Sequence, residues 1–133
     1  MNILIVDDSD TRLAQLRKIL TDMEQDVVGA AHDGGEAVQR YRELRPDAVI
    51  MDLIMPRMNG LDALREILRF DPDAVVVMAS SMRSPESALE CRRNGARYYL
   101  HKPFEPAVVR AVVEKLAAEM NGAIRVSPSK NSP

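Results

Sequence analysis

Short apolar runs alternate along the chain with segments whose apolar residues recur at every third or fourth position. The apolar runs predict five strands, at residues 3–6, 27–31, 49–52, 74–79 and 97–101. Helical spacing between and after them predicts five helices, which begin near Ser9, Asp33, Gly60, Ser84 and Pro106. The helix from Gly60 carries Leu61, Leu64 and Leu68 at helical spacing. This alternation is typical of an α/β protein with a parallel sheet and helices on both faces.

The polarity of each strand predicts its position in the sheet. Strands buried on both faces are continuously apolar, so the first, third and fourth strands are expected at the centre. The second strand contains Gly29 and the fifth contains Arg97 and His101, so these two are expected at the edges. The result is a doubly wound five-stranded parallel sheet in the order 2-1-3-4-5. Its switch point lies between the first and third strands, where a ligand crevice is expected.

Polar side chains follow the apolar runs at the points where the strands end. Asp7 and Asp8 end the first strand, Asp52 the third, Ser80 the fourth and Lys102 the fifth. Because the carboxyl ends of parallel strands share one edge of a sheet, these groups are expected to gather on one rim. Taken singly, each could be a helix cap, a turn residue or a surface charge. That interpretation weakens for the set, because every one of them falls on the same rim.

Three carboxylates held together in a partly shielded site repel one another. A hard divalent cation with oxygen ligands offsets this repulsion, and Mg²⁺ suits a site with few protein ligands and several waters. Lys102 adds a positive charge and Ser80 a hydroxyl donor. The set therefore indicates a receptacle for a phosphoryl group, with Asp52 as the candidate nucleophile.

Composition and charge narrow the classes of partner. The chain has 133 residues, 46% of them hydrophobic, which suits one domain with a buried core. Its net charge of −2 and scattered basic residues predict no direct nucleic-acid partner and no membrane partner. The single Cys91 and the lack of a signal-peptide pattern predict a cytoplasmic protein. The domain is expected at residues 1–121, followed at 122–133 by a disordered tail or the start of a linker.

Four motifs together resemble the response-regulator receiver domain, the phosphoacceptor module of two-component signalling. They are Leu-Ile-Val-Asp-Asp at 4–8, Met-Asp-Leu-Ile-Met-Pro-Arg-Met-Asn-Gly at 51–60, Val-Met-Ala-Ser at 77–80 and the Lys-Pro motif within 95–104. The similarity covers residues 2 to about 121 and is greatest to stand-alone, chemotaxis-type regulators. It implies a flavodoxin-like fold with the same strand order.

The resemblance also implies a role for each candidate residue. Asp52 is the phosphoacceptor, and Mg²⁺ is held by Asp7, Asp8, Asp52 and the backbone carbonyl of Ile54. Ser80 and Lys102 contact the phosphoryl oxygens. Ser80 and Tyr99 form the conformational switch, and a cis peptide bond joins Lys102 to Pro103.

The partners follow from the same resemblance. A sensor histidine kinase or a phosphotransfer protein supplies the phosphoryl group. An output partner reads the face made by the helix from Ser84, the fifth strand and the helix from Pro106. The chain is not expected to be an enzyme beyond self-catalysed phosphotransfer and autodephosphorylation.

Three alternatives remain open from the sequence. The chain could be the receiver of a longer regulator with an output domain beyond Pro133. It could be an aspartate-based phosphohydrolase, although that activity needs a second acid at position 54, where isoleucine stands. It could also be a receiver-shaped scaffold that is never phosphorylated, which the complete set of acidic and basic residues disfavours.

Overall fold

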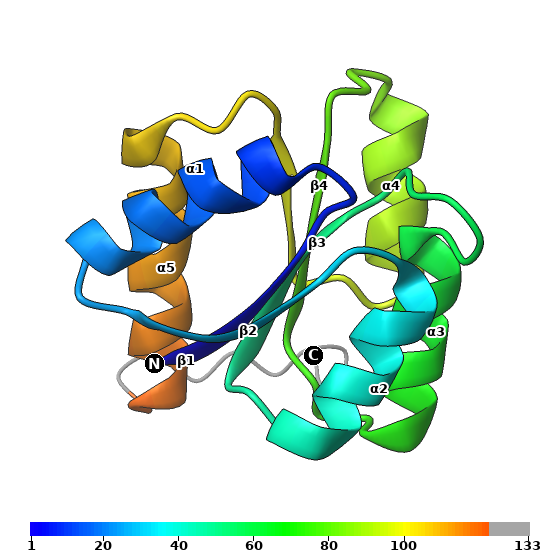
Figure 1. The fold of residues 1–133 in the computed structure, drawn as a ribbon, viewed down its shortest axis with the longest axis horizontal. Coiled ribbons are helices and arrows are strands. Elements are labelled where there is room, and N and C mark those ends of the chain that lie inside the picture. The colour runs from blue at the N-terminus through cyan, green and yellow to red at the C-terminus, as the bar shows by residue number, and fades with distance from the viewer. Residues whose placement is uncertain (123–133) are drawn as a thin grey trace.

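In a computed structural model, which describes residues 1–122, five parallel strands form one sheet between two layers of helices (Figure 1). The strands are β1 (Asn2–Val6), β2 (Asp26–Ala31), β3 (Ala48–Asp52), β4 (Val76–Ser80) and β5 (Tyr98–His101). The helices are α1 (Asp10–Asp22), α2 (Gly34–Leu44), α3 (Gly60–Phe70), α4 (Pro85–Arg93) and α5 (Pro106–Met120). The strand order is β2-β1-β3-β4-β5, which confirms the predicted fold class and topology.

The two faces of the sheet carry separate apolar cores. Helices α1 and α5 cover one face, and α2, α3 and α4 cover the other (Figure 1). Successive residues of β1 alternate between the cores, because side chains of a strand point to opposite faces: Ile3 and Ile5 pack under α1 and α5, and Leu4 and Val6 under α2 and α3. A strand with helices on both sides buries every side chain, which explains its continuous apolar run.

Four helices begin at the side-chain caps that the sequence indicates. Ser9, Asp33, Asn59 and Ser84 each accept a hydrogen bond from the backbone amide three residues further on. Helix α5 begins at Pro106 and has no side-chain cap. Since α1 and α2 start within a few residues of a strand's carboxyl end, their first turns also lie at the rim where the polar residues gather.

One boundary of the predicted elements is wrong. Strand β4 begins at Val76, two residues later than predicted, because the Ala74 amide bonds the Asp71 carbonyl in a turn. In α3 the buried stripe consists of Gly60, Ala63, Leu64 and Ile67, whereas Leu61 and Leu68 are only partly buried against the core. Gly60 turns this stripe toward the sheet because its amide bonds the Leu53 carbonyl at 2.8 Å.

The predicted tail lies, except for Gly122, outside the described residues. No helix within residues 1–122 is long and apolar enough to span a membrane.

Candidate functional site

Three carboxylates meet at the carboxyl ends of β1 and β3, which are neighbouring strands. Asp7 and Asp8 directly follow β1, and Asp52 is the last residue of β3. One oxygen from each lies within 4.8 Å of the others. Asp7 and Asp52 are buried, whereas Asp8 is exposed. The structure thus brings together the three acids that the sequence assigns to one site.

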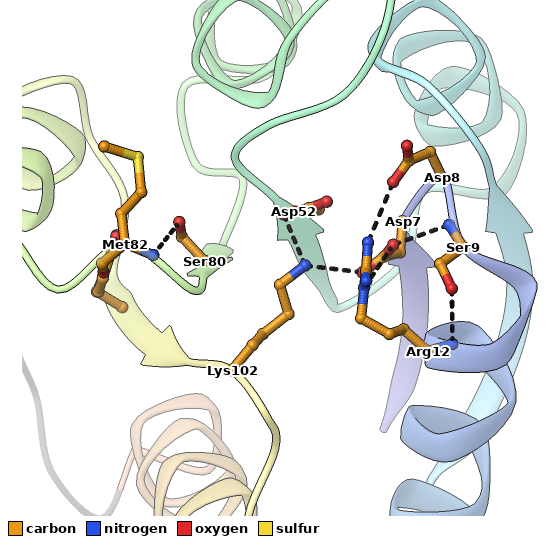
Figure 2. A network of polar contacts seen from close by, with 9 residues as sticks. Asp7, Asp8, Ser9, Arg12, Asp52, Ser80, Met82 and Lys102 are labelled. Carbon is orange, nitrogen blue, oxygen red and sulfur yellow. Dashed lines mark hydrogen bonds and ion pairs between the residues drawn. The ribbon is translucent and has the colours of Figure 1, made fainter.

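Lys102 crosses from the end of β5 and bridges two of these acids (Figure 2). Its Nζ lies 2.9 Å from Oδ1 of Asp52 and 3.1 Å from Oδ2 of Asp7. The side chain is only 7% exposed, so the ammonium is held away from bulk water. The Lys102 amide donates to the Ser80 carbonyl at 2.9 Å, and the bond to Pro103 is cis. The buried ammonium neutralises part of the charge that three acids would otherwise concentrate here.

The two buried acids respond to this environment in opposite directions. Burial raises the pKa of Asp52; the bond to Lys102 lowers it without cancelling the rise, and the charge of Asp7 raises it further. Burial also acts to raise the pKa of Asp7, but hydrogen bonds from Arg12, the Ser9 amide and Lys102 outweigh it, so that pKa lies below its usual value. In the absence of a cation, Asp52 is therefore the acid whose charge is less well compensated.

Arg12 is also part of the site, although the sequence pattern did not predict it as a site residue. It lies in the first turn of α1, and its Nε is 3.1 Å from both carboxylate oxygens of Asp7. Its Nη2 lies 3.3 Å from Oδ1 of Asp8. The side chain is 41% exposed. The signal that could have identified it is its place in the first turn of the helix that directly follows the Asp7–Asp8 pair.

These groups line a cleft of about 520 Å³ that opens at the rim. Its lining residues are Asp8, Arg12, Asp52, Ile54, Ser80, Ser81, Lys102 and Pro103. The Ile54 backbone hydrogen bond to Asp52 acts to lower the pKa of that carboxyl, and the Ile54 side chain is 59% exposed. Asp52 therefore lies on a cleft that has charged walls and an apolar residue at its edge.

Ser80 and Tyr99 are linked through the backbone of Met82. The buried Ser80 hydroxyl accepts a hydrogen bond from the Met82 amide at 3.0 Å (Figure 2). The Tyr99 hydroxyl lies 3.3 Å from the Met82 carbonyl and 3.3 Å from the Ser87 hydroxyl of α4. A movement of Ser80 toward the cleft would disturb the segment that also holds Tyr99.

A comparison with protein families agrees with this geometry. The profile of the response regulator receiver domain matches residues 3–114. This chain belongs to that family. Receiver domains are components of two-component systems, and the acid cluster of this one, with Asp52 at the end of β3, fits the phosphoacceptor site of the family.

Individual relatives are similar over most of the length of this chain. The receiver domain is 40% identical to the chemotaxis protein CheY of Thermotoga maritima over 115 residues, which cover 86% of this chain and 96% of that protein. It superimposes on CheY in the CheX–CheY–BeF₃–Mg²⁺ complex from Borrelia burgdorferi with a TM-score of 0.85 and 34% identity, covering 88% and 89% of the two chains. It is 34% identical to the protein-glutamate methylesterase of Pyrococcus abyssi, covering 95% of this chain but 35% of that enzyme.

The donor atoms of the receiver domain fit a Mg²⁺ ion. Hard oxygen donors are what this ion selects, and it usually keeps several waters beside one or two carboxylates. The carboxylate oxygens lie close enough to share one ion after small side-chain movements. The cleft also has room for bound waters.

Proposed function

We propose that this receiver domain is a phosphoacceptor that takes a phosphoryl group on Asp52 from a phosphohistidine of a sensor histidine kinase or a phosphotransfer protein. The observation that carries the proposal is the Asp52 carboxylate, buried beside Asp7 and Asp8 and 2.9 Å from the Lys102 ammonium. The phosphorylated form acts as a binding module for an output protein, in the manner of a stand-alone chemotaxis regulator.

Different residues of the chain have different roles in the phosphoryl transfer. A carboxylate oxygen of Asp52 forms the new O–P bond as the N–P bond of the phosphohistidine breaks and the donor imidazole leaves. The Lys102 ammonium offsets negative charge on a phosphoryl oxygen, and the Ser80 hydroxyl can turn from Met82 to donate to another. Mg²⁺, held by Asp7, Asp8, Asp52 and the Ile54 carbonyl, would neutralise charge on the phosphoryl group. Asp52 is consumed until the acyl phosphate hydrolyses, so the domain is not an enzyme acting on another substrate.

The test uses the unmodified protein and a small phosphodonor such as phosphoramidate. Intact-mass measurement should show the gain of one phosphoryl group with Mg²⁺ present and almost none with EDTA. Hydroxylamine should remove the group, because it cleaves acyl phosphates and leaves phosphoserine intact. Labelling that persists in EDTA, or that resists hydroxylamine, would contradict the proposal.

The output surface is proposed to be the face made by α4, β5 and α5. A groove on it is lined by Arg83, Tyr99, His101, Pro103, Glu105 and Val108. When Ser80 turns toward the phosphoryl group it releases the Met82 amide, and the Tyr99 hydroxyl then loses a fixed position for its own bond to Met82. Tyr99 is half-buried and held by Ser87 and Met82 here, rather than in a solvated position. A partner that binds one arrangement better than the other shifts the population toward it.

Side-chain NMR with beryllofluoride as a phosphoryl mimic tests this route. The Tyr99 ring resonances should move on addition of beryllofluoride and Mg²⁺. Tyr98 serves as an internal control, because it lies on the opposite face of β5 and its hydroxyl bonds Glu119 of α5. Unchanged Tyr99 resonances beside clear changes around Asp52 would mean that the signal leaves the site by another path.

One observation favours the alternative of a longer regulator. The similarity to the P. abyssi methylesterase shows that a unit like this one also occurs within a larger enzyme. The coding sequence beyond Pro133 distinguishes the two possibilities. The phosphohydrolase alternative gains no support, because Ile54 supplies no acid at the cleft.

A further inference from the structure

Arg12 occupies both acids that follow β1, and no step of the proposed transfer uses it. Its guanidinium contacts Asp7 through Nε and Asp8 through Nη2 (Figure 2). Both carboxylates are among the ligands that the proposed function assigns to Mg²⁺. One cationic side chain therefore contacts three carboxylate oxygens of the proposed cation site.

The acceptor positions of the Asp7 carboxylate are already occupied by hydrogen-bond donors. An ionised carboxylate offers about four lone-pair positions. Oδ1 of Asp7 accepts from the Ser9 amide at 2.9 Å and from Arg12 Nε at 3.1 Å. Oδ2 accepts from Arg12 Nε at 3.1 Å and from Lys102 Nζ at 3.1 Å. Three donors thus occupy the two oxygens, with the Arg12 Nε–H shared between them, so Asp7 binds a cation, or a water of its shell, only after one donor leaves.

Arg12 is the donor that can leave. The Ser9 amide is part of the backbone at the start of α1 and cannot turn away. Lys102 is 7% exposed and is also tied to Asp52. The Arg12 side chain is 41% exposed and can extend into solvent at little cost.

We infer that Arg12 is a displaceable internal counterion of the cation site: it pairs with Asp7 and Asp8 when no divalent cation is bound, and cation binding requires its release. The inference rests on the proposed function, because it takes Asp7 and Asp8 as cation ligands. Three acids face two cationic side chains, Arg12 and Lys102, in the structure. Arg12 thus lowers the affinity for Mg²⁺. When no cation is bound, its charge offsets part of the repulsion among the three carboxylates.

The experiment measures Mg²⁺ binding by calorimetry on the parent, Arg12→Gln and Arg17→Gln. Arg17 is a matched control, since it is an exposed arginine on the same helix, about 7.5 Å further along the axis. Arg12→Gln should bind Mg²⁺ about tenfold more tightly than the parent. Arg17→Gln should stay within about twofold, because exposed charges that far apart interact only weakly through water. In EDTA, Arg12→Gln should melt below the parent, because Asp7 loses one of its three donors.

A second measurement needs no substitution. The Nε–Hε signal of Arg12 should move during a Mg²⁺ titration of the parent, while that of Arg17 stays in place. Equal Mg²⁺ affinity of the parent and Arg12→Gln, with an unmoved Arg12 signal, overturns the inference and leaves the proposed function intact. Failure of the parent and of Arg12→Gln alike to bind Mg²⁺ overturns both, and the phosphodonor experiment would then show no dependence on Mg²⁺.

Discussion

Replacing Asp52 with asparagine is expected to abolish phosphorylation of this protein, by at least about a thousandfold in rate, or roughly 4 kcal/mol in the barrier. An amide is a far poorer nucleophile than a carboxylate at phosphorus. The neighbouring acids cannot substitute for it: both oxygens of Asp7 are already bound by donors, and Asp8 lies on the exposed side of the cluster. Intact-mass measurement with phosphoramidate and Mg²⁺ gives the result directly.

Asp26→Asn is a matched control for this substitution. Asp26 is an exposed carboxylate at the start of β2, at the opposite end of the strands from the cleft. That variant should gain a phosphoryl group at the parent's rate. An Asp52→Asn protein that gained one equally fast would remove Asp52 from the role of acceptor.

The same variant should be more stable than the parent when Mg²⁺ is chelated. Since the pKa of Asp52 is raised above 3.8 in the folded state, the folded protein binds more protons than the unfolded chain between that value and the raised pKa. Stability therefore falls as pH increases through this window, and the loss is fully present above it. Asparagine avoids the loss, so thermal melting in EDTA at neutral pH should occur a few degrees higher. The difference should disappear below pH 3.8. A lower melting temperature would mean that Lys102 overcompensates the burial of Asp52.

Gly60→Ala is expected to have the largest effect on stability. A Cβ at Gly60 would lie 2.2 Å from the Asp52 carbonyl oxygen and 2.9 Å from the Leu53 Cα. Both are backbone atoms at the end of β3, so they can move only if the strand and the Asp52 side chain move with them. We expect a loss of about 3 kcal/mol, which corresponds to a fall of roughly 10 °C in Tm. Thermal melting followed by circular dichroism measures it.

Gly35→Ala is the control for the change of residue type. The nearest atom to its new Cβ would be Oδ1 of Asp33 at 3.4 Å, an ordinary contact. Gly35 lies in the first turn of α2, so alanine should be neutral or stabilising by up to about 1 kcal/mol. If Gly60→Ala melted as the parent does, α3 would not approach the end of β3 as closely as described.

The sequence could predict the strand order and the gathering of Asp7, Asp52 and Lys102, because both follow from apolar runs and from where each run ends. It could not predict the pairing of Arg12. That contact depends on the rotamer of a long side chain, and many exposed arginines have an acid four residues away. The direction of the Ser80 hydroxyl toward Met82 depends in the same way on the loop after β4.

The rotation of α3 about its axis is a second feature that the sequence could not predict. Leu61, Leu64 and Leu68 fit helical spacing as well as the observed stripe does, and periodicity alone does not fix the rotation of a helix about its axis. The close approach of Gly60 to the end of β3 decides that rotation. It is a contact between residues eight positions apart, which a pattern of apolar residues does not contain.

The bridge between Asp7 and Lys102 also decides when the proposed acceptor site is complete during synthesis. These residues lie 95 positions apart in the sequence, and Asp52 lies between them. All three acids leave the ribosome before the lysine that compensates them. A nascent chain that ends before β5 therefore presents the acceptor without its ammonium partner and without an edge strand to hold β4. On the proposed function, competence for phosphotransfer arrives only after Lys102 has been made, so chains that end before it would not take phosphoryl groups from the donor.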